Sequence, residues 1–170
     1  MSRTKTYIAA DWDTDYEVVE KLYEWNNSDF YNLHFLNAHD EKQARDSSKY
    51  CSVRKSLKDR MDISKTLVLI VGSNTNSITK GSCKYCDRYS SYYSKCLDGY
   101  SLDFRSYIKY ECDKAVEAGI KVVVIYNYAN VDKQKCPESV RNIGTHLPFY
   151  FYKDGKCYYN YSAIKNAIMN

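Results

Sequence analysis

The sequence has few of the residues that interrupt structure, and it has no long hydrophobic run. Only two prolines and six glycines occur in 170 residues, which excludes collagen-like and low-complexity chains. The longest apolar run, residues 66–72, is far shorter than the roughly 20 residues needed to cross a bilayer. The net charge of +4 is small and evenly spread along the chain. We therefore expect neither a membrane nor a nucleic-acid partner.

The amino-terminal segment and the cysteine content indicate a reducing compartment. Residues 1–13 contain no apolar core of a signal peptide, so a cytoplasmic location is expected. The seven cysteines, an odd number, are then expected to be thiols or metal ligands and not a disulfide framework. Aliphatic residues are scarce, and the 19 tyrosines supply much of the large side-chain volume that a core requires.

Short apolar runs alternate along the chain with amphipathic segments. We expect strands at residues 6–10, 33–37, 66–71, 121–127 and 146–152, and helices at residues 15–26, 51–63, 102–118 and 162–169. Continuously apolar strands separated by helices predict a parallel sheet covered on both faces. The expected fold is a three-layer α/β/α domain with a five-stranded, flavodoxin-like sheet. It spans residues 1–170 and carries a Cys- and Tyr-rich insert at about residues 79–101.

A ligand site is expected at one rim of this sheet. In doubly wound sheets the ligand lies beyond the carboxyl ends of the strands, near the switch in strand order. Three segments follow predicted strands and should meet there, at residues 11–15, 39–46 and 72–75. They are polar, and the first two are rich in carboxylates.

One carboxylate falls on the side of a predicted helix that should pack against the sheet. When residues 102–118 are projected at about 100° per residue, Glu111 lies in an apolar arc between Ala118 and Phe104. Tyr107 precedes it by one turn on the same edge. A carboxylate there costs several kcal/mol unless it is paired or opens into a pocket. Three interpretations stay open: a structural ion pair with a core arginine or lysine, a rim position that reaches water, and an acid in a binding pocket.

Four segments resemble those of bacterial Toll/interleukin-1 receptor (TIR)-like domains, and they occur in the same order. They are YIAADWD at residues 7–13, RDS at 45–47, LVLIVGSNT at 67–75 and SYIKYE at 106–111. The last resembles the aromatic-x-x-x-Glu motif of TIR domains that cleave NAD, with tyrosine in place of the usual tryptophan. The resemblance covers roughly residues 5–128 and is closest to the TIR-like family of Thoeris antiphage defence.

This resemblance implies an enzyme that takes NAD as substrate and releases nicotinamide. Glu111 would be the catalytic carboxylate, stabilising the positive charge that develops on the ribose. The ADP-ribose product, hydrolysed or cyclic, would activate a separate effector protein. The residues expected to contact the substrate are Asp11, Trp12, Asp13, Asp40, Ser73 and Tyr107. For the aspartates, helix capping is the alternative role.

The main alternative to an enzyme is a non-catalytic interaction module. Domains that resemble this one also act by assembling with each other, and a tyrosine-rich surface suits partner binding and self-association. The sequence contains neither G-x-G-x-x-G nor G-x-x-x-x-G-K-[ST], so dehydrogenase and P-loop functions lack their phosphate-binding loops.

The cysteines of the insert suggest a metal site. Cys83 and Cys86 form a C-x2-C pair, and with Cys96 and Cys112 they have the composition of a four-thiolate zinc site. Zinc binding would stabilise an ordered conformation of the insert, which has few aliphatic residues. The alternative is a set of unrelated reduced thiols.

Overall fold

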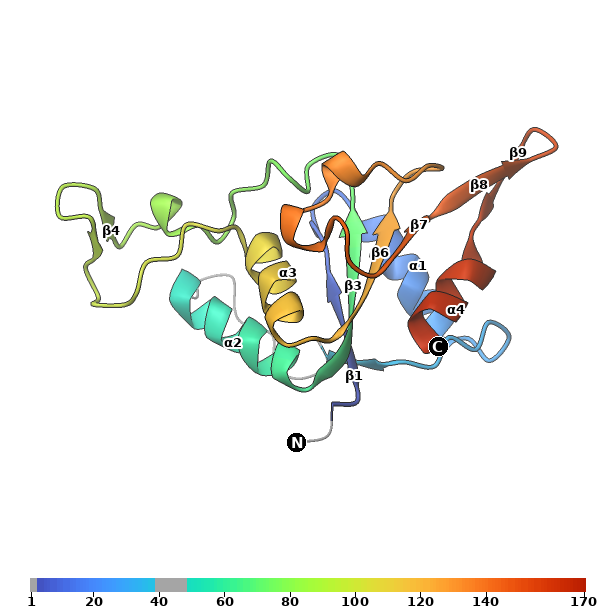
Figure 1. Cartoon of the computed structure of the whole chain (residues 1–170), viewed down its shortest axis with the longest axis horizontal. Coiled ribbons are helices and arrows are strands. Elements are labelled where there is room, and N and C mark those ends of the chain that lie inside the picture. Colours follow the sequence, from blue (N-terminus) through green and yellow to red (C-terminus); the bar gives the residue numbers. More distant parts are fainter. Residues whose placement is uncertain (1–2, 39–48) are drawn as a thin grey trace.

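Five parallel strands form the central sheet of the computed structural model, which describes residues 3–38 and 49–170 (Figure 1). The strand order is β2-β1-β3-β6-β7. The strands are β1 (Lys5–Ala9), β2 (Leu36–Asn37), β3 (Ser64–Val71), β6 (Lys121–Tyr126) and β7 (Thr145–Pro148). This is the predicted flavodoxin-like order, with the switch in strand order between β1 and β3.

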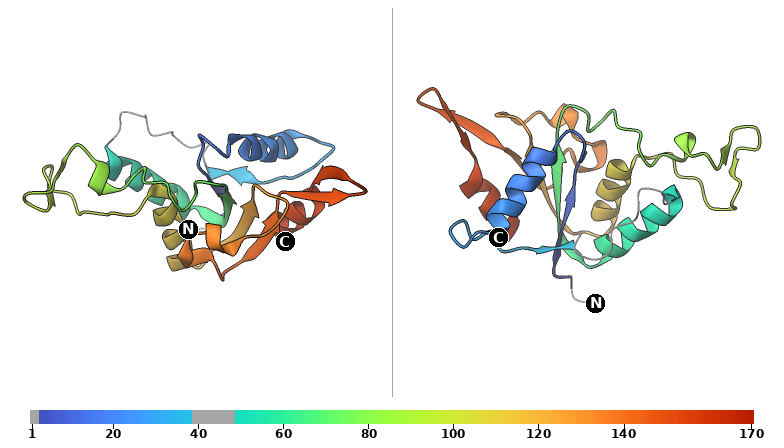
Figure 2. Two further views of the ribbon diagram at one scale, coloured as in Figure 1. Left: turned by 90° about the horizontal axis from the view of Figure 1, so that it is seen from above. Right: turned by 180° about the vertical axis from the view of Figure 1, so that it is seen from behind.

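Within the described residues, helices cover both faces of the sheet, so the fold has the predicted three layers (Figure 2). The four helices are α1 (Tyr16–Asn27), α2 (Tyr50–Asp62), α3 (Tyr107–Glu117) and α4 (Tyr161–Met169). Side chains of β3 alternate between the two cores: Leu67 and Leu69 pack with α2 and α3, whereas Val68 and Ile70 pack with α1 and α4. Burial on both faces explains why this strand is apolar throughout.

Helix α3 begins five residues later than predicted. Ser106 caps it, since its hydroxyl accepts a hydrogen bond from the Lys109 backbone N–H at 3.3 Å. Phe104 consequently lies outside the helix and is 54% exposed, so its predicted place in the apolar arc is wrong. The helix ends as expected, with Gly119 in the left-handed conformation at φ +61°.

The predicted strand at residues 146–152 is divided between two sheets. Its first part is β7, and its second is β8 (Tyr150–Lys153), which pairs with β9 (Lys156–Tyr159) in an antiparallel hairpin. The turn is Asp154-Gly155, with both residues at positive φ, as two-residue hairpin turns require. The hairpin extends away from the central sheet (Figure 1).

The insert has little regular structure and extends from the opposite side of the molecule (Figure 1). It holds a single turn, η2 (Cys83–Tyr85), and a short hairpin of β4 (Tyr89–Ser90) and β5 (Lys95–Cys96). Two further turns, η3 (Lys133–Lys135) and η4 (Glu138–Val140), follow β6. Among the described residues, no helix has the length and hydrophobicity of a membrane span.

Candidate functional site

Segments that follow β1, β3 and β6 meet at the predicted rim of the sheet. Asp15, after β1, accepts a hydrogen bond from the side-chain amide of Asn127, after β6, at 3.0 Å. Gly72, at the end of β3, lies directly against the Asp15 carboxylate. Asp15 is 1% exposed, and burial raises the pKa of its carboxyl. The rim therefore brings a buried acid to the place where a ligand was expected.

Replacing Gly72 by alanine is expected to destabilise the protein. The added Cβ would overlap the Asp15 carboxylate, which would have to leave its buried position. Such overpacking costs about 1 to 3 kcal/mol in free energy of unfolding, measurable by denaturant titration. Ser73→Ala, at the exposed neighbouring position, is the control and should change stability by less than about 0.5 kcal/mol. Equal stability of the two variants would contradict the close packing at Gly72.

A pocket of about 510 Å³ opens beside this rim. This volume lies within the range of small-molecule and cofactor sites. The residues that line it come from the β1–α1 turn, from the start of α2 and from the segment after β3: Asp11, Asp13, Thr14, Tyr50, Asn74, Ser77, Ile78, Thr79, Lys80 and Tyr85. It combines two carboxylates, one ammonium, two aromatic rings and several hydroxyls.

The predicted contact residues are only partly gathered in this pocket. Asp11 and Asp13 line it, but Trp12 and Ser73 do not. Asp11 also stabilises the turn before α1, because its carboxylate accepts from the Thr14 hydroxyl at 2.7 Å and the Asp13 N–H at 3.3 Å. This is a contact within the turn and not the helix capping considered for the aspartates, because the N-cap of α1 is Asp15, whose side chain makes no capping hydrogen bond. Asp40 lies outside the described residues.

Glu111 lies on the buried side of α3, as the helical projection predicted. It is 7% exposed, and its Oε1 accepts a hydrogen bond from the Tyr7 hydroxyl of β1 at 2.5 Å. Burial raises the pKa of Glu111 to about 7, although the Tyr7 hydrogen bond and the positive charge of Arg60 oppose this rise. Burial thus moves the titration of this carboxyl toward neutral pH.

Glu111 does not line the 510 Å³ pocket, so it is not an acid of this pocket. Tyr107, one turn earlier, connects the two places. Its ring lies against Gly81 and makes an edge-to-face contact with Tyr50, at a centroid distance of 5.8 Å. Tyr50 itself lines the pocket. The Tyr50–Tyr107 contact thus links the pocket to the first turn of α3, the helix that carries Glu111.

Removing the Tyr7 hydroxyl is expected to raise the pKa of Glu111 further. The hydrogen bond from Tyr7 favours the ionised carboxylate, and such bonds to charged groups contribute about 1.5 to 3 kcal/mol. In Tyr7→Phe the pKa should rise by about one unit, measured by the pH dependence of the ¹³C carboxyl shift of labelled glutamate. Tyr126→Phe, which removes a hydroxyl bonded to His146, is the matched control and should leave that titration in place. A fall in the Glu111 pKa in Tyr7→Phe would contradict this role.

The predicted zinc ligands are not all in one place. Cys112 is 0% exposed in the core between α3 and the sheet, whereas Cys83, Cys86 and Cys96 belong to the insert. As the side chains stand, no group of three or more His, Cys, Asp or Glu residues within residues 3–38 and 49–170 could hold a metal ion. Cys112 is therefore a core residue in this structure.

The order of the sheet strands and the helices on both faces define a flavodoxin-like α/β/α domain. The sequence comparison adds a family similarity: the family described as Thoeris protein ThsB, TIR-like domain, matches residues 7–80. This segment, less than half of the chain, is thus similar to TIR-like domains of the Thoeris type. No curated protein matches the chain.

The family match covers only part of the candidate site. It begins in β1, includes Asp11 and Asp13, and ends at Lys80, at the edge of the pocket. Tyr107 and Glu111 lie beyond it. The assignment of a role to Glu111 therefore depends on its burial, its hydrogen bond and its position, not on the match.

Proposed function

We propose that this protein cleaves NAD between nicotinamide and ribose, in the setting of antiphage defence. The observation that carries this proposal is Glu111, a buried carboxylate on the helix that begins beside the rim pocket. A charged group in a protein core is costly to folding, and strongly perturbed acids occur most often at functional sites. The family match supports the defence setting.

The chemistry of the bond suits a single carboxylate. Breaking it leaves positive charge on the ribose, and a negative group placed beforehand in a water-poor site stabilises that charge. Glycosidases pair such a group with an acid that protonates the leaving group. Nicotinamide departs as a neutral molecule and needs no proton, so the ionised form of Glu111 suffices. Water or a hydroxyl of the same ADP-ribose then completes the reaction.

The pocket residues offer suitable partners for the rest of the dinucleotide. The ammonium of Lys80 can pair with the diphosphate, and the carboxylate of Asp13 can accept hydrogen bonds from ribose hydroxyls. Tyr85, 57% exposed, offers a ring for base stacking. The nicotinamide end would approach Glu111 past Tyr50 and Tyr107. Trp12 and Ser73 remain predicted contacts of the substrate.

The product would act as a signal for a separate effector protein. Cleavage leaves an ADP-ribose unit that keeps both phosphates and both riboses. That unit carries enough charge and hydrogen-bonding groups to be recognised specifically. Hydrolysed and cyclic products share the bond-breaking step and differ only in the acceptor.

A second candidate function is a non-catalytic interaction module that assembles with itself. It is favoured by the β8–β9 hairpin, which extends from the sheet and exposes four aromatic side chains, at 40% to 68%: Phe151, Tyr152, Tyr158 and Tyr159. Aromatic residues are enriched at protein interfaces. In this case Tyr152→Ala would reduce self-association in sedimentation, and NAD would remain intact.

The test is nicotinamide release from NAD by the purified chain, alone and with extract of phage-infected cells. The proposal expects release in at least one condition, and no release by a variant that lacks the carboxylate at position 111. Intact NAD in both conditions, with correctly folded protein, would reject the enzyme and leave the interaction module.

A further inference from the structure

The insert and the start of α2 enclose a second, much smaller hollow. Its volume is about 10 Å³, which is room for roughly one water-sized sphere and for no organic ligand. Its walls include four of the seven cysteines, namely Cys51, Cys83, Cys86 and Cys96. All four thiols are free, and three of them are only partly buried.

Local structure brings these four thiols together from separate parts of the chain. Cys83 and Cys86 stand at the two ends of the single turn η2, where the Cys86 N–H donates to the Cys83 carbonyl at 3.1 Å. The β4–β5 hairpin follows at once and returns Cys96 opposite Tyr89. Cys51 comes from the first turn of α2. A C-x2-C turn followed by a hairpin is a compact way to present three sulfurs to one point.

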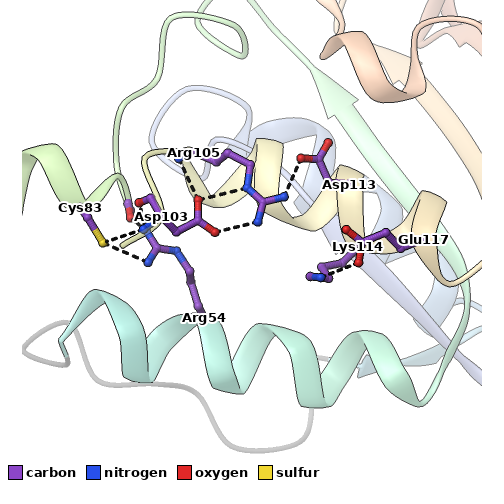
Figure 3. A network of polar contacts seen from close by, with 8 residues as sticks. Arg54, Cys83, Asp103, Arg105, Asp113, Lys114 and Glu117 are labelled. Carbon is purple, nitrogen blue, oxygen red and sulfur yellow. Dashed lines mark hydrogen bonds and ion pairs between the residues drawn. The ribbon is translucent and has the colours of Figure 1, made fainter. Parts of the chain in front are cut away.

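Two hydrogen-bond donors point at the sulfur of Cys83. Arg54 is 6% exposed, and its guanidinium donates to the Cys83 sulfur at 3.3 Å and to the carbonyls of Gly81 and Asp103 (Figure 3). Within residues 3–38 and 49–170, its Nε has no hydrogen-bond partner. The Asp103 N–H also donates to the Cys83 sulfur, at 3.4 Å. Donors around a metal-bound sulfur hold that ligand in place, so these two contacts suit a sulfur that binds a metal.

The charged side chains around the hollow leave an excess of positive charge, which favours a zinc tetrathiolate. Four thiolates and one Zn²⁺ carry a net charge of about −2. Lys49 and Arg88 line the hollow and Arg54 adjoins it, while Asp98 pairs with the first two at 2.7 and 2.8 Å. The Asp87 carboxylate accepts a hydrogen bond from the Cys86 thiol at 3.6 Å. Three cations and two carboxylates leave an excess of one positive charge, which would offset about half of the charge of the cluster.

We propose that Cys51, Cys83, Cys86 and Cys96 bind one Zn²⁺ ion in the small hollow. Zinc is held by four thiolates in many structural sites, and its binding releases the protons of the thiols. The four sulfurs as described do not form a ligand set, so they must turn inward. Rotation between staggered positions about the Cα–Cβ bond moves a sulfur without moving the backbone.

Such an ion would fasten the insert to α2 and would position one wall of the candidate substrate pocket. Cys51 is adjacent to Tyr50, which lines both the small hollow and the 510 Å³ pocket. The inference is independent of NAD cleavage, because a metal can be measured in a protein of either function.

The test uses the full chain, stripped of metal under reducing conditions and titrated with Co²⁺. We expect thiolate-to-cobalt absorption that saturates at about one equivalent and is abolished by Zn²⁺. Cys51→Ser should weaken metal binding at least about 10-fold. Replacing a residue that only hydrogen-bonds to a metal ligand already lowers metal affinity by about that factor. The matched control is Cys157→Ser, on the β9 strand of the other hairpin, which should bind as the parent does.

Two results would overturn the proposal. One is the absence of thiolate–cobalt absorption in the parent chain, a measurement that needs no variant. The other is equal metal affinity of Cys51→Ser and Cys157→Ser, which would remove Cys51 from the site. Zinc should also raise the thermal unfolding midpoint of the parent and of Cys157→Ser, but not of Cys51→Ser.

Discussion

Replacing Glu111 by glutamine is expected to lower the rate of nicotinamide release by about 100-fold or more, the usual cost of losing one transition-state electrostatic contact. Glutamine has the same shape and keeps an oxygen that can accept from the Tyr7 hydroxyl. It cannot carry the negative charge that the developing ribose cation requires. The measurement is nicotinamide release under saturating NAD, so that the loss is assigned to the bond-breaking step.

The matched control for this variant is Glu117→Gln on the same helix. Glu117 is exposed at the end of α3 and pairs with Lys114, so its replacement should leave the rate unchanged. The parent enzyme should also gain activity as pH rises through about 7, where Glu111 ionises. A Glu111→Gln variant that retains the parental rate would refute the catalytic role of this carboxylate.

The same substitution is expected to make the protein more stable at alkaline pH. The pKa of Glu111 is about 7 in the folded chain and 4.5 for the ordinary group, so the folded state holds its proton more tightly. Stability from this group is complete below about pH 4.5 and is lost as pH rises through about 7. The difference between the two values corresponds to roughly 3 kcal/mol.

Denaturant unfolding at pH 5 and pH 8 measures this effect. Glu111→Gln lacks the ionisable group, so its free energy of unfolding should exceed that of the parent by a few kcal/mol at pH 8 and by much less at pH 5. Asp15 and the other acids are present in both chains and cancel in the comparison. Glu117→Gln should follow the parent at both pH values. A parent that gains stability relative to Glu111→Gln as pH rises would show that the carboxylate is stabilised as an anion, by a cation.

The fold was largely predictable because its signals are local. The apolar runs of β1, β3 and β6 and the periodicity of α1 and α2 lie within one or two residues of the observed elements. The predicted buried side of α3 was also correct, although the predicted first residue of the helix was not. Ile108, Glu111 and Ala115 are spaced three and four residues apart, and all three are buried. The spacing identifies the buried side wherever the helix begins.

The β8–β9 hairpin and the limits of β2 were not predicted. Residues 146–152 read as one strand, but β7 joins the parallel sheet and β8 turns away to pair with β9. Strand pairing depends on which partner is available in space, and alternating hydrophobicity does not encode that. The Asp154-Gly155 turn was the one sequence signal of the hairpin.

The side-chain contacts within the candidate site could not be predicted from the sequence, for the same reason. Tyr7 and Glu111 are 104 positions apart and meet only because α3 packs on the face of the sheet to which Tyr7 belongs. Cys51 and Cys83 face one hollow because α2 lies beside the insert.

The sequence alone determined the order of strands and helices, the family resemblance and the buried side of α3, because these follow from neighbouring residues. Only the tertiary structure decided that Glu111 bonds to Tyr7 and does not line the 510 Å³ pocket, that Tyr50 lines it, and that Cys112 belongs to the core. Those outcomes depend on how distant elements pack, and packing is a property of the whole chain.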